Sequence, residues 1–322
     1  MSPTSLAEWS NLAVYSSMLV LTVAFIAFAV GFAARGQRVS APEAKVPVGA
    51  GAPVPADGAV VSGDADLIVP ADKEAGRRAG NIGLSLTWLA FGILMVGLVL
   101  RGLWAGRVPW GNMYEFSLAS AAGILAVYLG ISLWRDVRWL GLFVTGATLL
   151  TLGLAVTVLY TEAAQLVPAL KSWWLLIHVS AAVICGGAFT VAAGITVLYL
   201  WRDRAERRGR VTGMVAKLPD AARLDTLAYR ILAFAFPLWT FAVIAGAIWA
   251  ENAWGRYWGW DPKETWAFIT WVIYAGYLHA RSTAGWRGRR AAYISLLGFA
   301  AFLINYFGVN LFVNSLHSYS GM

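Results

Sequence analysis

The sequence contains three histidines, His178, His279 and His317, whose imidazole rings are its strongest candidates for metal chemistry. An imidazole nitrogen ligates iron, zinc or copper, and haem iron commonly takes such axial ligands. Each histidine lies in or beside a long apolar stretch, where an ionisable group is costly to bury and marks a functional candidate. The alternative for each one is a polar side chain satisfied by hydrogen bonds at a helix end.

Several other chemistries lack the residues that they need. The single cysteine, Cys185, excludes an internal disulfide, a Cys-x-x-Cys pair and an iron–sulfur cluster built by this chain alone. There is no His-Glu-x-x-His, Gly-x-Ser-x-Gly, P-loop or Gly-x-Gly-x-x-Gly motif, so zinc hydrolysis, acyl transfer and nucleotide chemistry have no support.

A tryptophan-rich stretch, WAENAWGRYWGWDPKETW, occupies residues 249–266. Its indoles are interleaved with small residues that let a chain bend close to a planar ligand, which makes the stretch a candidate aromatic platform. An interfacial aromatic belt is the alternative, but a belt requires no particular spacing. The predicted ligand-binding residues are Trp254, Gly255, Tyr257, Trp258, Gly259, Trp260 and Asp261.

The end of this stretch predicts a helix start. Asp261 is a good N-cap, Pro262 suits the first helical position, and Glu264 can complete a capping box. His279 follows Asp261 by 18 residues, which places it about 27 Å further along such a helix. His178 and His317 share a membrane face with the tryptophans, so the histidines suggest two haem positions or a path for haem through the membrane.

The elements that must position these residues are apolar helices. Of 322 residues 59% are hydrophobic and 13% are charged, which excludes an ordinary soluble globule. We expect an all-α integral membrane protein with about eight transmembrane helices, because eight windows approach the 20 apolar residues that a span needs. These windows are residues 11–34, 82–103, 115–134, 139–160, 174–201, 227–250, 263–280 and 291–314.

The basic residues predict the orientation. Residues 35–80, 135–138, 202–230 and 281–290 hold 20 of the 25 Lys and Arg residues, so these alternate loops are predicted to be cytoplasmic. Both termini and the loops 104–114, 161–173 and 251–262 then lie on the extracytoplasmic side of the cell membrane.

Three regions are predicted. Residues 1–34 form a first transmembrane helix, residues 35–80 a disordered cytoplasmic linker, and residues 81–322 a seven-helix haem-handling core with the extracytoplasmic loop 251–262. The basic segment 202–226 is interpreted as a topogenic loop, with a short surface helix that holds anionic lipid as the alternative.

Several motifs resemble one family. WGRYWGWDPKETW resembles the WGxxWxWD signature of haem-handling (WWD) proteins, and LVPALKSWWLLIHVS, YLHAR and NLFVNSLHSYSG resemble the CcsA/ResC branch of system II cytochrome c biogenesis, named CcsB in some bacteria. The likeness covers roughly residues 80–322. Residues 107–115 look like an outer loop of that family, with Trp110 and Met113 departing from its usual residues.

The resemblance implies haem transport to the outer face and its covalent attachment to apocytochrome c at a Cys-x-x-Cys-His motif. In that family His178 and His317 would ligate an outer haem over the tryptophan loop, and His279 would serve an inner haem site. Haem b is then the cargo, and a ResB/Ccs1-type membrane partner supplies the missing ligand. The chain would be one subunit of a holocytochrome c synthase (haem lyase). A haem transporter without a ligase role and a haem-containing electron-transfer subunit are the alternatives.

Overall fold

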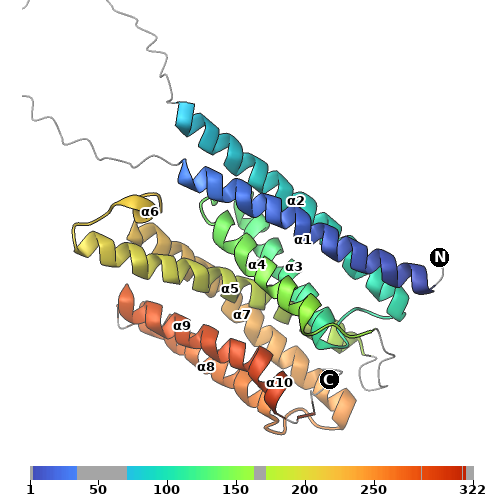
Figure 1. Ribbon diagram of the computed structural model, residues 1–322. Coiled ribbons are helices and arrows are strands. Elements are labelled where there is room, and N and C mark those ends of the chain that lie inside the picture. The colour runs from blue at the N-terminus through green and yellow to red at the C-terminus, as the bar shows by residue number, and fades with distance from the viewer. Residues whose placement is uncertain (1–2, 35–70, 163–171, 284, 314, 317–322) are drawn as a thin grey trace, which may run out of the picture.

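The computed structural model describes residues 3–34, 71–162, 172–283, 285–313 and 315–316, and within them every regular element is a helix. The helices run back and forth between two ends of a bundle (Figure 1). We call the end with residues 106–112 and 255–261 the site end, and the end with residues 133–140 and 208–220 the basic end. The helices are α1 (Pro3–Ala33), α2 (Ala71–Ala105), α3 (Met113–Ser132), α4 (Gly141–Thr157), α5 (Trp173–Arg207), α6 (Gly213–Ala216), α7 (Ala221–Trp254), α8 (Pro262–Ser282), α9 (Arg289–Leu303) and α10 (Val309–Phe312).

The predicted all-helical membrane fold is confirmed in its class. Six helical segments of the described chain are long and apolar enough to cross a bilayer, and α4 is a shorter apolar helix. Helix α8 coincides with the predicted span 263–280, but it is less apolar on average and is not one of those six. The count of eight spans and the sidedness of the termini therefore stay predictions.

Helix α2 begins earlier than the sequence indicates. Residues 71–80, assigned above to the linker, form its first turns. An i,i+4 ion pair between Arg78 and Glu74, 2.5 Å apart, supports this extension. The rest of the predicted linker lies outside the described residues. The segment 202–226 holds no single surface helix, because it is divided among the end of α5, the four-residue α6 and the start of α7.

The helices pack closely through small and polar residues. Helix α1 lies along α2, where Ser10 and Ser17 donate hydrogen bonds to the carbonyls of Gly97 and Ala90 at 2.9 and 2.8 Å. Helix α5 crosses α3 so closely that a Cβ at Gly187 would lie 2.4 Å from the α3 backbone. Such contacts hold apolar helices together where the hydrophobic effect between them is absent.

A π-helical turn, Ile304–Gly308, joins α9 to α10 near the site end. Single π turns often occur at functional sites. This one buries Asn305 and Tyr306, and the Tyr306 hydroxyl lies 2.9 Å from Ser117 Oγ of α3. The turn therefore fixes the last helical segment against the core of the bundle.

Candidate functional site

The loop between α7 and α8 is organised by the buried carboxylate of Glu264. The backbone N–H groups of Gly259 and Asp261 donate to it at 2.8 and 3.1 Å, and Arg256 Nη1 donates at 3.0 Å. One buried carboxylate accepts hydrogen bonds from three separate points of the loop. These bonds hold the loop in a defined conformation. The sequence indicated Glu264 as part of a capping box and did not indicate its bond to Arg256.

Asp261 has two roles at the same helix start. Its Oδ1 accepts a hydrogen bond from Lys263 N at 3.1 Å, and the predicted capping box with Glu264 is confirmed. Its Oδ2 accepts from the backbone N–H of Leu316 at 2.9 Å. The chain immediately before His317 is thereby tied to the tryptophan loop, while His317 itself lies outside the described residues.

The three candidate tryptophans do not form a single flat surface. The ring planes of Trp258 and Trp260 are inclined by 89°, with centroids 5.7 Å apart. Trp254 ends α7, and its ring meets Trp249 edge-on at 4.8 Å. Trp260 is 65% exposed and is the one non-glycine residue in the described ranges with a positive φ, 57°. A planar ligand could stack on one of these indoles and meet another with its edge.

Two further members of the predicted set shape the loop. Gly255 takes a left-handed φ of 68° directly after α7, where a side chain would be strained. Tyr257 is 61% exposed beside Trp258. The loop thus presents several aromatic faces toward its surroundings.

His178 lies in the second turn of α5, held between two neighbours on α7. Its Nδ1 is 2.7 Å from the carbonyl oxygen of Ala242, and its ring is stacked at 7° on Trp249. Since a carbonyl can only accept, Nδ1 donates; in the neutral ring, Nε2 then carries the lone pair. This is the orientation in which a backbone carbonyl prepares a histidine to ligate a metal.

Gly246 makes that close approach possible. A Cβ at this position would lie 2.7 Å from the His178 ring, which is closer than real Cβ atoms come. The imidazole therefore occupies space on α7 that any residue larger than glycine would fill. The sequence contained no sign of this contact, because the two residues are far apart along the chain.

A cavity of about 180 Å³ opens beside His178 at the site end. It is smaller than the ~300 Å³ of a typical ligand pocket, so a large ligand would extend beyond it over the loop. Its polar side includes Lys263, whose Nζ donates to Asn310 Oδ1 at 2.7 Å, and Asn305, whose buried Oδ1 has no hydrogen-bond partner among the described residues. The aromatic side chains that line it are Trp110, Phe116, Trp239, Trp249, Tyr257, Trp258, Phe302 and Tyr306.

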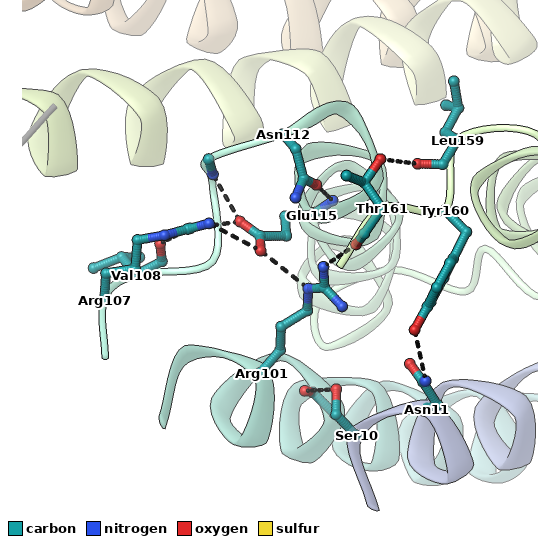
Figure 2. A network of polar contacts seen from close by, with 12 residues as sticks. Ser10, Asn11, Arg101, Arg107, Val108, Asn112, Glu115, Leu159, Tyr160 and Thr161 are labelled. Atoms are coloured by element: carbon teal, nitrogen blue, oxygen red, sulfur yellow. Dashed lines mark hydrogen bonds and ion pairs between the residues drawn. The ribbon is translucent and has the colours of Figure 1, made fainter. Parts of the chain in front are cut away.

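The opposite wall of the cavity comes from the loop before α3. Glu115 is fully buried and accepts hydrogen bonds from Gly111 N at 2.7 Å, Arg107 Nη1 at 2.6 Å and Arg101 Nε at 3.0 Å. Figure 2 shows both guanidinium groups converging on this carboxylate. Arg101 also donates to the carbonyl of Thr161, so the network joins α2, the loop before α3 and the chain after α4.

The loops before α3 and α8 share one local design. In each, an arginine lies five residues before the N-cap, a Trp-Gly pair follows it, and the N3 glutamate bonds to both the arginine and the glycine N–H. The N-cap residues are Asn112 and Asp261. Both loops line the cavity. Sequence reasoning missed this correspondence because the Trp-Gly pairs differ by one position relative to the caps.

His279 lies away from this site. Helix α8 is continuous from Pro262 to Ser282, so His279 is about 26 Å from the helix start by helical rise. Its side chain is exposed on the bundle, near the basic end. No group of three or more His, Cys, Asp or Glu side chains suited to a metal occurs in the ranges that the structure describes.

Comparison with known proteins decides the family. A family model described as "Cytochrome C assembly protein" matches residues 110–317, which is more than half of the chain. The chain belongs to the cytochrome c assembly protein family. The matched region of this assembly protein contains both walls of the cavity and all three histidines.

Individual relatives agree with the resemblance to CcsA. The cytochrome c biogenesis protein CcsA of Guillardia theta is 36% identical over 256 residues, 74% of this chain and 85% of that protein. The CcsA protein of Synechococcus sp. (strain JA-3-3Ab) is 36% identical over 297 residues, covering 75% and 84% of the two chains.

A solved structure shares the fold of this assembly protein. The cytochrome c haem lyase CcmF superposes with a TM-score of 0.59 at 17% identity, over 95% of this chain. The assembly protein spans about half of that structure, 47% of its length.

Proposed function

We propose that this chain binds haem b at the site end and delivers it for thioether attachment to apocytochrome c. The observation that carries the proposal is the placement of His178, whose Nδ1 donates to Ala242 while the ring faces a cavity walled by the tryptophan loop. A histidine with this orientation suits haem iron, and aromatic walls suit the macrocycle. The names of the family and of its relatives support the same chemistry.

His317 is the proposed second axial ligand. The bond between Leu316 N and Asp261 brings its neighbour in the chain to the tryptophan loop. Two imidazoles would saturate the iron and limit reaction with oxygen while the haem waits. Trp254, Tyr257, Trp258 and Trp260, on the backbone set by Gly255, Gly259 and Asp261, would contact the rings and edges of the haem.

The proposed transfer depends on proximity. The histidine of the incoming Cys-x-x-Cys-His motif would replace one axial imidazole and bring two thiols beside the two haem vinyl groups. Each thiol adds across a vinyl double bond, so that sulfur bonds to one carbon and a proton reaches the other, with no net oxidation. The substrate supplies both nucleophiles, and this chain supplies a fixed orientation.

The remaining parts of the proposal concern location and partner. The protein would be a multi-pass protein of the cell membrane, with the cavity on the extracytoplasmic side. His279 would ligate an inner haem together with a histidine of a ResB/Ccs1-type partner, which makes this chain one subunit of a system II haem lyase. Its exposed position near the basic end leaves it accessible to another membrane protein.

A direct test compares the wild-type protein with His178→Ala by absorption spectroscopy, with and without added imidazole. We expect the variant to lose the spectrum of iron with two imidazole ligands and to regain part of it with imidazole. Haem stain on a co-expressed apocytochrome c then separates a lyase subunit from a transporter, which would leave no covalent adduct. An unchanged haem spectrum in His178→Ala would contradict the proposal.

A further inference from the structure

A second and larger cavity lies at the basic end, far from His178. It has a volume of about 1580 Å³ and is formed where the end of α1, the start of α2, the turn between α3 and α4, and the segment from α5 to α7 meet. These parts of the chain are grouped at one end of the bundle in Figure 1. We call this cavity the basic cleft.

Positive charge dominates the lining of the basic cleft. Its basic residues are Arg77, Arg135, Arg138, Arg202, Lys217, Arg223 and Arg230, whereas its acidic residues are Asp136 and Asp220. Asp136 is engaged by Arg138 at 2.7 Å, and Asp220 both caps α7 and pairs with Arg223 at 3.2 Å. The carboxylates of the lining are therefore occupied by its own arginines.

Three arginines of the lining are exposed and carry charge that no carboxylate of the cleft neutralises. Arg77, Arg135 and Arg230 have no hydrogen-bond or ion-pair partner within the described part of the chain, and each comes from a different segment. Lys217 donates to the carbonyl of Ala33 at the end of α1 and adds a fourth positive charge. Cations gathered in a concave site repel each other unless an anion joins them.

The floor of the same cleft is apolar. Phe28, Phe32, Val137, Trp139 and Leu224 contribute to its lining, and all five are buried in the bundle. A ligand that fits both parts carries an anionic head group and a hydrocarbon tail. The general preference for basic loops on one side of a membrane explains why basic residues occur at this end. It does not require that basic residues from four separate segments line the same cleft.

We propose that the basic cleft binds an anionic phospholipid, with its phosphate among Arg77, Arg135 and Arg230 and an acyl chain along the apolar floor. Basic pockets between membrane helices bind lipid head groups in this way. The proposal is independent of haem handling. The segment 202–226 adds the positive charge of Lys217 to the same cleft.

Native mass spectrometry of the full chain, released from nanodiscs that contain phosphatidylglycerol or phosphatidylcholine, tests this proposal. We expect retained phosphatidylglycerol on the wild-type protein and on Arg135→Lys/Arg230→Lys, and retention lower by about tenfold on Arg135→Gln/Arg230→Gln. The matched control is Arg208→Gln/Arg210→Gln, which removes two exposed charges at the same end but outside the cleft.

The remaining outcomes overturn the proposal. Equal loss in the control would show that overall charge, and not the cleft, holds the lipid. Equal retention of phosphatidylcholine would remove the requirement for an anionic head group. Displacement of the lipid by millimolar inorganic phosphate would show a site for a free anion.

Discussion

At the scale of single residues, the site depends on small details around a few polar groups. His178 is oriented by one carbonyl and one indole plane, and it fits because Gly246 has no side chain. One carboxylate oxygen of Asp261 accepts a hydrogen bond at the start of α8, and the other accepts one from the backbone just before His317. The positions Gly246 and Asp261 each permit a substitution with a matched control elsewhere in the bundle.

Gly246→Ala is expected to displace the imidazole of His178. The added methyl would lie 2.7 Å from the ring, so the bond from Nδ1 to Ala242 would be strained or lost. Loss of such an orienting bond weakens metal binding by roughly 10- to 100-fold. Haem titration followed by absorption spectroscopy measures the effect. The control is Gly194→Ala on α5, where an added Cβ meets open space, and equal affinity in both variants would contradict the expectation.

Asp261→Ala is expected to lower haem retention beyond its effect on helix stability. Loss of an N-cap costs about 1 kcal/mol, and Asp220→Ala at the start of α7 removes a cap of the same kind. Only Asp261 also holds Leu316. Haem content and unfolding temperature should therefore separate the two variants, with similar stability losses but less haem in Asp261→Ala. Matching haem content would argue against a role for the Leu316 contact.

At the scale of elements, two loop-and-helix units face each other across the cavity. Each places a buried glutamate at N3, with an arginine and a glycine N–H as its donors. The unit before α3 is the more deeply buried, since Arg101 adds a second guanidinium to Glu115. This unit therefore links the wall of the cavity to the packing of α2 and α4.

Glu115→Gln is expected to destabilise the fold strongly. Arg101 and Glu115 are both fully buried, and removing one partner of such a pair leaves an uncompensated charge at a cost of about 3–5 kcal/mol. Glu74→Gln breaks the exposed pair with Arg78 and should change stability by less than about 0.5 kcal/mol. Denaturation in detergent, followed by tryptophan fluorescence, compares the two. Similar midpoints would show that the network in Figure 2 contributes little to stability.

Local patterns account for what the sequence could predict. The apolar windows and the capping box at Asp261 involve residues within a few turns of one another, and the structure has helices at each window. The acceptor for His178, the arginine partners of Glu115 and the crossed planes of Trp258 and Trp260 depend on contacts between distant segments. No periodicity or spacing rule contains that information.

At the scale of the whole molecule, the two proposed binding regions occupy opposite ends of the bundle. The cavity beside His178 lies at the site end, and His279 and the basic cleft lie toward the other end. Helix α8 connects them, since it begins at the tryptophan loop and ends beyond His279. A haem that moved between the two ends would travel roughly the thickness of a bilayer core.

His279→Ala tests whether the two ends handle haem in sequence. At about 26 Å from the start of α8, His279 can affect the outer haem by supplying it but not by ligating it. We expect less haem on the whole protein, while the haem that reaches the site end keeps a spectrum of two imidazole ligands. The measurement is haem content and absorption spectrum, each with and without the ResB-type partner. Arg287→Ala, an exposed change at the same end, is the control.

Normal haem loading of His279→Ala in the presence of the partner would exclude the inner haem position. A histidine that only makes local hydrogen bonds would not limit the supply of haem to the site end. Haem binding beside His178 and the tryptophan loop would not be affected, since it depends on contacts at the other end of the bundle.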